Sequence, residues 1–293
     1  MRRIGGFTLL ALVAVLTLAS PSCSFGNPKP ADHYPLRVAT WNVQWFPGKS
    51  PRNDPAAEDA HIASVATVLQ RLNADILLFQ EVKAWAPLER VVSGLPRIRI
   101  HVLSRFPNPI GGGVGPQQLA IASRLPAWSA WSEPWKQSWA NAPRGFAFAA
   151  LDDGSGTPIL VYNVHLKSNL GDPVANTSKR EDASAQLLAH MAEMKRAYGS
   201  EKVIVGGDFN TDMEGVGLAG ENTLRAMAES GLFWTFEGLP LTNRVTLPAK
   251  GRYPDACFDH ILTKGFGRPV AQVTPTPEAS DHHPVSIVIT PTP

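Results

Sequence analysis

Short apolar, β-branched runs alternate with segments of helical periodicity, and this alternation constrains the fold more than any other sequence feature. Four runs have the length and composition of buried strands: residues 36–43, 75–82, 159–166 and 202–209. Between the members of each pair, residues 56–72 and 178–198 repeat apolar side chains every three or four positions, as amphipathic helices do. The chain therefore contains two strand–helix–strand units of similar size and order.

Two such units predict a layered α/β fold. Each sheet half would be covered by helices on its outer side, which gives a four-layer α/β/β/α sandwich of two packed mixed sheets. Further strands are expected at residues 119–123, 146–151, 258–263 and 285–290, and a shorter helix at 221–230. No linker is long enough to divide residues 35–293, so we expect one catalytic domain there.

The first residues are typical of an export signal. Arg2 and Arg3 precede an uncharged run over residues 7–19, which is shorter than the roughly 20 apolar residues that span a bilayer. We expect residues 1–22 to be cleaved, leaving residues 23–34 as a flexible segment. The mature protein would then lie in the periplasm, in the cell envelope or outside the cell.

Cys23 adds an alternative, which is attachment of a lipid after cleavage. The preceding residues match a bacterial lipoprotein signal only in part, because Ser20 stands where that pattern has an aliphatic residue. Two cysteines exclude a disulfide-dense scaffold. Removing Arg2 and Arg3 from the 27 basic residues balances the 25 acidic ones, so attraction to nucleic acid or membrane would need a local basic patch.

Two other segments are distinctive in composition. Residues 127–139 carry four of the eight tryptophans, and we expect a hairpin whose indoles pack on the domain. The alternative is a stacking surface for bases or lipid headgroups. Residues 107–116 are rich in Gly and Pro and lack the ending of a phosphate-binding loop, so they are interpreted as a turn region.

Polar side chains gather at the ends of the predicted strands. An acid or amide that ends an apolar strand is costly to bury alone, so each of these groups requires a partner. Several strands that deliver such groups to one rim form a site. Its candidate members are Asn42, Glu81, Asn163, His165, Asp208, Asn210, Asp259, Asp281 and His282.

The chemistry of this set favours phosphoester hydrolysis. Oxygen ligands are in the majority and no thiolate cluster is present, which suits Mg²⁺ or Mn²⁺, with Ca²⁺ as a further option, better than zinc. Histidines supply proton-transfer groups near neutral pH. A hard cation beside carboxylates and histidines is what in-line hydrolysis of a phosphoester requires.

The segments that carry these residues also resemble a known family. They are, in chain order, TWNVQWF, FQEV, YNVHLKS, GGDFN, FDHI and SDHHPV. In this order and spacing they resemble the endonuclease/exonuclease/phosphatase superfamily, of which deoxyribonuclease I is a member. The resemblance runs from about Leu36 to Ile289, and it implies the same sandwich fold and a metal-dependent phosphoric ester hydrolase.

The resemblance implies a metal side of the site. Glu81 would be the principal metal ligand, and Asn42 would complete the metal shell or contact the phosphate. Asp281 would support this side. Asp208 would orient or deprotonate the attacking water, and Asn210 would donate to a phosphoryl oxygen.

The resemblance also implies a proton-transfer side. His282 would be the general base or a phosphate contact, polarised by Asp259. His165 would face the leaving oxygen, as in the deoxyribonuclease and sphingomyelinase branches, and Asn163 would line the same rim. Whether Asp208 or His282 takes the proton of water stays open.

Three substrate classes remain. A nuclease ranks first, although the neutral total charge does not favour it. It needs basic residues near the rim, and the candidates are Arg97, Arg99, Arg105, Lys136, Arg144, Lys167, Lys179 and Arg180. Of these, Lys167 and Arg180 are the candidate phosphate contacts, with a solvated or helix-start position as the alternative.

A phospholipid, sphingomyelin or small-molecule phosphodiesterase ranks second, since it suits export and the Trp-rich segment. An inositol-phosphate phosphatase would need a denser basic cluster. An inactive family member that only binds is disfavoured, because every polar motif position is filled. We expect a monomer whose partner is a phosphodiester, either nucleic acid or phospholipid.

Overall fold

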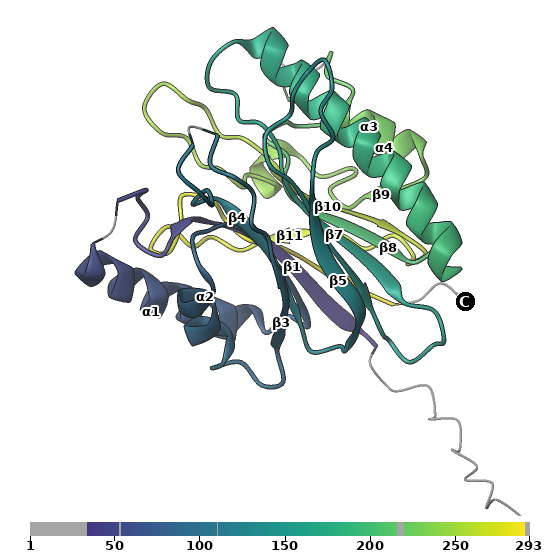
Figure 1. The fold of residues 1–293 in the computed structure, drawn as a ribbon, viewed down its shortest axis with the longest axis horizontal. Coiled ribbons are helices and arrows are strands. Elements are labelled where there is room, and N and C mark those ends of the chain that lie inside the picture. The colour runs from purple at the N-terminus through teal and green to yellow at the C-terminus, as the bar shows by residue number, and fades with distance from the viewer. Residues whose placement is uncertain (1–33, 53, 110, 216–219, 291–293) are drawn as a thin grey trace, which may run out of the picture.

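The computed structural model describes residues 34–52, 54–109, 111–215 and 220–290. The predicted export signal, Cys23 and nearly all of the predicted N-terminal segment lie outside these residues. Within them, two sheets of six strands pack face to face, with helices on both outer sides (Figure 1). The predicted α/β/β/α sandwich of two mixed sheets is confirmed. In the described part of the chain, no helix is long and apolar enough to cross a membrane.

The first sheet has the strand order β11-β12-β1-β2-β4-β3, in which β1 and β2 are parallel and the other pairs antiparallel. Its strands are β1 (Leu36–Phe46), β2 (Ile76–Val82), β3 (Arg99–Leu103), β4 (Gln118–Ser123), β11 (Gln272–Val273) and β12 (Val285–Ile289). Two helices close an apolar cluster on its outer face; they are α1 (Pro55–Leu72) and α2 (Trp85–Val92).

The second sheet has the order β5-β6-β7-β8-β10-β9, in which only β7 and β8 are parallel. Its strands are β5 (Ala127–Pro134), β6 (Gly145–Leu151), β7 (Ile159–His165), β8 (Val203–Asp208), β9 (Phe233–Trp234) and β10 (Asp259–Lys264). The remaining elements are α3 (Pro173–Tyr198), α4 (Thr223–Glu229) and the single-turn helix η1 (Leu241–Asn243).

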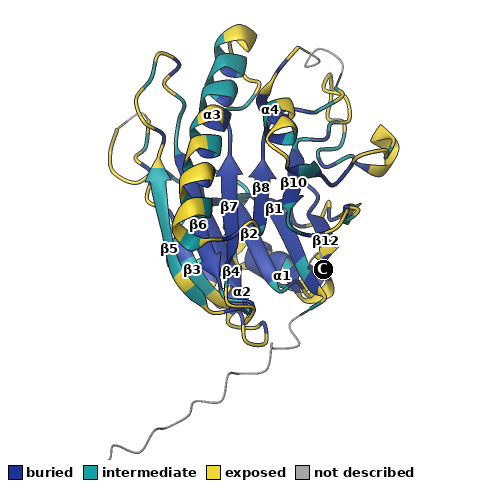
Figure 2. Cartoon of the chain, turned by 90° about the vertical axis from the view of Figure 1, so that its right-hand side faces the viewer, coloured by how far each residue is buried: buried dark blue, intermediate teal, exposed yellow. Residues whose placement is uncertain are grey.

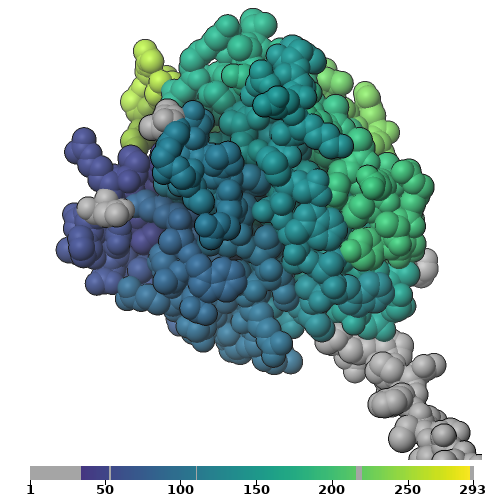
Figure 3. Space-filling view, viewed as in Figure 1, coloured from purple at the N-terminus to yellow at the C-terminus, as the bar shows by residue number. Residues whose placement is uncertain are grey.

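The core lies between the sheets and continues under α3 and α4. Figure 2 shows the buried strands and, on the viewer's side of them, α3 with an exposed outer face. The space-filling view separates the two strand–helix–strand units: purple and blue residues occupy one side and green residues the other (Figure 3). The two units predicted from the sequence thus form the two halves of the sandwich.

The two long helices begin in the same way. Asp54 caps α1 and Asp172 caps α3, each accepting from two free backbone N–H groups, and a proline occupies the first helical position of both. This cap makes α3 start at Pro173 rather than at the predicted Ser178, because Asp172 and Pro173 together fix the first turn.

The Trp-rich segment forms β5, an edge strand paired with β6. Trp131 packs on Phe148 with ring centroids 4.4 Å apart, and Trp135 is buried. Trp128 and Trp139 remain 49% and 79% exposed. The expected hairpin is therefore present, but only part of its indole surface is covered.

Strand register places three polar residues side by side at one end of the second sheet. His165 is the register partner of Asp208, and Asp208 is the partner of Asp259 across β7, β8 and β10. Gly207 allows this approach, since its φ is +149° and a Cβ there would collide with the carbonyl oxygen of Val164. The position before Asp208 in GGDFN is therefore restricted to glycine on steric grounds.

Candidate active site

The side-chain amide of Asn42 joins two carboxylates that come from different sheets. Its Nδ2 donates to Oε1 of Glu81 in β2 at 3.3 Å and to Oδ2 of Asp208 in β8 at 3.0 Å. Asn42 and Asp208 are each 1% exposed. One amide therefore holds two acids close together across the interface between the sheets.

Neutral donors hold Glu81. The backbone N–H of Trp45 donates to Oε2 at 2.9 Å, and Nε2 of Gln117 donates to Oε1 at 3.0 Å. Among the described residues its ion-pair partner is a histidine, His165, with Nε2 at 3.9 Å. Burial raises the pKa of Glu81, against the charge of His282 and the hydrogen bonds from Trp45 and Asn42. No Lys or Arg of the described residues therefore forms an ion pair with this acid.

His282 is fixed by a carboxylate. Its Nδ1 lies 2.7 Å from Oδ2 of Asp259, which is fully buried, and its backbone N–H donates to Oγ of Ser280 at 3.0 Å. Burial alone would lower the pKa of His282, but the carboxylate of Asp259, followed by that of Asp208, raises it to about 10. The ring is oriented so that only Nε2 faces the rest of the site.

Two imidazole rings converge on Asp208. Nε2 of His165 lies 3.5 Å from its Oδ2, and Nε2 of His282 lies 3.9 Å from the same atom. Burial raises the pKa of Asp208 to about 7, and the charge of Asp259 acts in the same direction. Burial, then the charge of Arg144, lowers the pKa of His165 well below its usual range. Acids and bases with shifted pKa values in one place are typical of proton-transfer sites.

Asn210 supports Asp208 from the turn after β8. Its backbone N–H donates to Oδ1 of Asp208 at 2.9 Å, and its φ is +53° in the left-handed region that asparagine tolerates. Its side-chain Nδ2 donates to the carbonyl of Leu166 at 3.2 Å. Asn210 therefore lies at the rim as predicted, with its amide directed to the loop after β7.

A comparison with protein families covers this whole arrangement. The model of the Endonuclease/Exonuclease/phosphatase family matches residues 39–282, which include every strand that carries a residue of the rim. The chain belongs to this family. No curated protein sequence matches the chain.

Solved structures show the same family fold. TDP2 from Caenorhabditis elegans is 16% identical, with a TM-score of 0.64 over 87% of this chain and 75% of that chain. The human Nocturnin catalytic domain with bound sulfate is 16% identical, with a TM-score of 0.64 over 90% and 96%. A mannosyl-6-phosphatase of Bacteroides thetaiotaomicron is 18% identical, with a TM-score of 0.63 over 87% and 99%. At these identities the similarity shows the fold alone.

The group with metal-binding geometry is not the set of ligands that the sequence predicts. In the described part of the chain, one group has ligand atoms all within 4.8 Å of one another: Asp208, Asp259 and His282. The predicted set of Glu81, Asn42 and Asp281 is a different one. A cation within the first set would replace the 2.7 Å hydrogen bond between His282 and Asp259, whereas Glu81 is held only by neutral donors.

Asp281 lies beside these groups. Its backbone N–H donates to Oε1 of Gln44 at 3.2 Å, and its charge acts on both Glu81 and His282. The structure thus brings Asp281 close to the predicted metal side. Its contribution there is electrostatic in the conformation described.

Asn163 does not lie on the rim, where the sequence placed it. Its Nδ2 donates to the carbonyls of Phe79 at 2.8 Å and Ala120 at 2.9 Å, and its Oδ1 accepts from Nε2 of Gln80 at 2.7 Å. The side chain is fully buried. Asn163 therefore connects the two sheets beneath the site instead of contacting a phosphate.

Arg180 also differs from its predicted place. It is 1% exposed and pairs with Glu221 through Nε at 2.7 Å and Nη2 at 2.5 Å, while Nη1 donates to the carbonyl of Lys167 at 2.9 Å. Lys167 donates to Oγ of Ser168 and to the carbonyl of Leu170, both at 3.1 Å. Arg180 therefore fixes the loop after β7 to α3. Its charge is neutralised by Glu221, so it is not placed to bind a phosphate.

Sequence reasoning missed Gln117, and it gave Arg144 no individual role. Gln117 precedes β4 and bonds Glu81, yet no motif marks it. Arg144 precedes β6 and donates to the carbonyl of His165 at 2.9 Å. An arginine directly before a glycine and an apolar strand was the available signal for Arg144.

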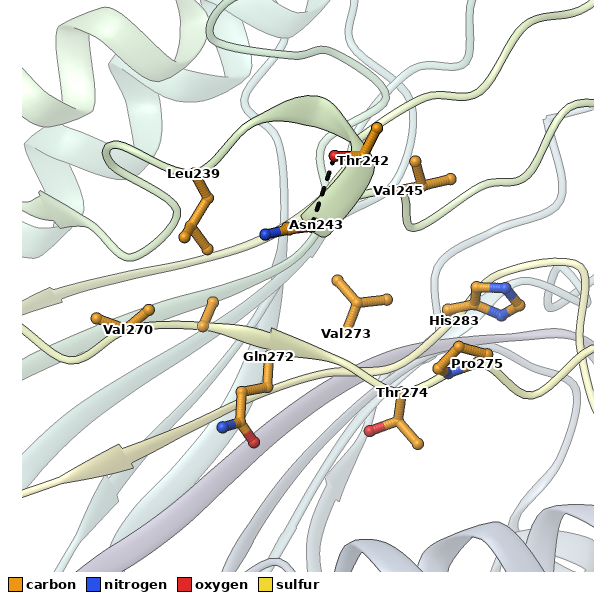
Figure 4. Close-up of a pocket in the computed structure, with 11 residues that line it drawn as sticks. Leu239, Thr242, Asn243, Val245, Val270, Gln272, Val273, Thr274, Pro275 and His283 are labelled. Atoms are coloured by element: carbon orange, nitrogen blue, oxygen red, sulfur yellow. Dashed lines mark hydrogen bonds between the residues drawn. The ribbon is translucent and has the colours of Figure 1, made fainter.

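A cavity of about 610 Å³ lies beside the site (Figure 4). Its lining comes from η1, β11 and their flanking residues, together with His283, the neighbour of His282. No carboxylate is among the residues that line it. The chemistry therefore belongs to the rim around Asp208 and not to this cavity.

Proposed function

We propose that this chain is an exported, metal-dependent hydrolase of phosphodiesters, with nucleic acid as its preferred substrate class. One observation carries the proposal: Oδ2 of Asp208 accepts from Asn42, and the Nε2 atoms of His165 and His282 both face it. Carboxylates and imidazoles that converge on one rim are the groups that hydrolysis of a phosphoester requires.

The residues divide the work by their fixed orientations. Asp208 orients the attacking water, with its own position set by Asn42 and by the backbone of Asn210. His282, held at Nδ1 by Asp259, presents Nε2 to a phosphoryl oxygen or to the proton of that water. His165, at the end of the neighbouring strand, faces the leaving oxygen.

Glu81 is the residue that would hold a divalent cation, together with Asn42 and with Asp281 in support. The donor set fits, because two buried carboxylates are bridged by a neutral amide and, among the described residues, meet no Lys or Arg within ion-pair distance. Oxygen ligands of this kind suit Mg²⁺ or Mn²⁺. A bound cation would neutralise charge on the phosphoryl oxygens.

A lipid phosphodiester is the second candidate substrate. It is favoured by exposed apolar side chains on loops beside the site, where Trp139 is 79% and Leu170 is 68% exposed. Trp139 lies on the loop that leads to Arg144, and Leu170 lies on the loop that follows His165. An amphipathic rim of this kind would suit a lipid surface.

The test is a substrate panel with Mg²⁺ or Mn²⁺: plasmid DNA, RNA, sphingomyelin vesicles, bis-p-nitrophenyl phosphate and p-nitrophenyl phosphate. Cleavage of DNA or RNA together with bis-p-nitrophenyl phosphate supports the nuclease. Hydrolysis confined to sphingomyelin moves the assignment to the lipid class. Activity restricted to the monoester overturns the diesterase proposal.

Export is tested by the N-terminus of the mature protein. Mass spectrometry of protein purified from its native cells should give a first residue between about positions 20 and 30, with or without lipid on Cys23. An intact Met1 on a cytoplasmic protein would overturn this part of the proposal.

A further inference from the structure

Arg144 is a cation beside the site that, in the described ranges of the chain, pairs with no carboxylate. Nε donates to the carbonyl of His165 at 2.9 Å, Nη2 to the carbonyl of Leu166 at 2.8 Å, and Nη1 to Oε1 of Gln117 at 3.2 Å. These acceptors are neutral, and they use three of the five N–H groups of a guanidinium. Two N–H groups are left for a further acceptor, although the charges of Glu81 and Asp208 act on the guanidinium from a distance.

The backbone fixes Arg144 in this position. Its φ is +68°, a left-handed conformation that is uncommon for arginine. The next residue must be glycine, since a Cβ at Gly145 would collide with the carbonyl of Glu133, and the carbonyl of Arg144 accepts from the N–H of Trp135 at 3.0 Å. A strained, well-supported backbone that aims a charged side chain at a site is a pointer to function.

Two lysines lie near Arg144: Lys167 on the loop after β7, and Lys179 in the first half of α3. Arg144 binds the carbonyls of residues 165 and 166, and Arg180 binds the next carbonyl, that of Lys167. Burial lowers the pKa of Lys167, and so do the charges of Lys179, Arg144 and Arg180. Four cations therefore lie around a single short loop.

Of these four cations, Arg180 has a carboxylate in direct contact among the described residues. Glu221 pairs with Arg180, whereas no ion pair joins Arg144, Lys167 or Lys179 to an acid of the described residues. Like charges held together raise the free energy of the folded protein unless an anion binds between them. In Figure 2 the start of α3 and the end of β7 lie at the same end of the sheet as the end of β8, where the antiparallel β10 starts.

We propose that Arg144, Lys167 and Lys179 form a second anion subsite, which binds a phosphate of the substrate next to the one hydrolysed. This inference rests on the proposed function and narrows its substrate to polyanions with consecutive phosphates, such as an oligonucleotide. A phosphodiester with a single phosphate would leave these cations without a partner. Two phosphates bound side by side fix the register of cleavage along the strand.

The experiment compares dithymidine substrates that differ by one phosphate: TpT, pTpT and TpTp. For the wild type, we expect kcat/KM for pTpT or for TpTp to exceed that for TpT by about tenfold or more, the value of one charge-assisted hydrogen bond. Lys179→Gln and Arg144→Gln should reduce this preference to near one. Both variants should hydrolyse TpT with a smaller change.

Arg196→Gln is the matched control, because Arg196 is an exposed cation near the far end of α3, about 25 Å from Lys179 at 1.5 Å per residue. It should keep the wild-type preference. Lys179 makes no hydrogen bond or ion pair within the described residues, so Lys179→Gln tests the subsite even if Arg144→Gln folds poorly.

Binding in EDTA separates this inference from the proposed function. Calorimetry should show tighter binding of pTpT or TpTp than of TpT to the wild type, and the difference should vanish in Lys179→Gln. If this binding difference is found but the protein turns over none of the substrates with Mg²⁺ or Mn²⁺, the subsite stands and the proposed hydrolysis fails. Equal binding of all three, including none, overturns the subsite. Equal losses of kcat/KM for all three substrates in Lys179→Gln and Arg144→Gln would also overturn the subsite. Such losses would mean that the cations act on the charges of Glu81 and Asp208 and not on a second phosphate.

Discussion

Nδ1 of His282 lies 2.7 Å from Oδ2 of Asp259, and Asp259 is fully buried. The two residues come from the turn before β12 and the start of β10, which belong to different sheets. This hydrogen bond therefore joins the two sheets at the rim. It also leaves Nε2 as the ring nitrogen that faces Asp208.

The first prediction concerns His282. Replacement by alanine removes a group used chiefly in the transition state, so kcat should fall by about 10²–10⁴ with a smaller change in KM. Steady-state kinetics on bis-p-nitrophenyl phosphate measures both constants. Near-normal turnover by a folded His282→Ala protein would remove His282 from the mechanism.

The second prediction tests whether Asp259 and His282 act as one unit. Asp259 acts through His282 in this scheme, so Asp259→Asn should cost less than His282→Ala. The double variant should lose far less than the combined losses of the two single variants, because both remove one functional unit. Independent, multiplicative losses in kcat would leave the site intact but separate the two residues.

The third prediction concerns Glu81. Glu81→Gln keeps the shape of the side chain and removes its charge, so a lost metal ligand should raise the Mg²⁺ concentration needed for half-maximal rate. Raising the metal concentration should then recover part of the activity. Asp75→Asn is a control, because Asp75 directly precedes β2, forms an ion pair with Arg124 and lies outside the rim. A loss for Glu81→Gln that no metal concentration changes would exclude the ligand role.

Sequence order alone could place much of the rim. His165, Asp208 and Asp259 stand at the ends of apolar runs, so strand pairing brings them together once the sheet forms. The β-branched runs and helical periodicity likewise fixed the order of the layers. These features are local, and local patterning is what a sequence displays most directly.

Other positions depend on distant partners that no local pattern marks. Asn163 looks like a rim residue, yet its bonds to Phe79 and Ala120 follow from how the two sheets pack. Arg180 is neutralised by Glu221, 41 positions later in the chain. Such pairings follow from packing between elements, so the sequence alone places Asn163 on the rim and Arg180 beside a phosphate.

The fourth prediction follows from the position of Asn163. Asn163→Leu removes the buried hydrogen bonds to the carbonyls of Phe79 and Ala120 and the bond from Gln80, so the free energy of unfolding should fall by about 2–4 kcal/mol. Urea denaturation measures the loss. The kcat/KM of the folded fraction should change little, and a large loss of kcat/KM at unchanged stability would return Asn163 to the rim.

The fifth prediction concerns pH and a site far from the rim. Asp153 is 2% exposed and accepts from Lys202 and from the hydroxyl of Tyr34, both at 2.6 Å. Burial alone would raise the pKa of Asp153, but Lys202, Tyr34 and Ser155 lower it below its usual value. An aspartate whose pKa is lower in the folded than in the unfolded protein stabilises the fold at any pH above its unfolded pKa of about 3.9. This contribution is lost as the pH falls through the pKa of the folded state.

Urea denaturation at pH 7 and at about pH 3 should therefore separate the wild type from Asp153→Asn. The difference in the free energy of unfolding should be large at pH 7 and smaller at the lower pH. Asp152→Asn, at a neighbouring position without an ion pair in the described structure, should show a small difference at both. If the difference in the free energy of unfolding between the wild type and Asp153→Asn were the same at both pH values, the charge of Asp153 would contribute nothing to stability.

The most direct test of the account is turnover of bis-p-nitrophenyl phosphate by the purified protein with and without a divalent cation. We predict hydrolysis with Mg²⁺ or Mn²⁺, its abolition by EDTA, its recovery when metal is restored, and its loss in His282→Ala measured in parallel. Full activity in metal-free buffer, or no hydrolysis by a folded protein under any metal condition, would contradict a metal-dependent phosphodiesterase.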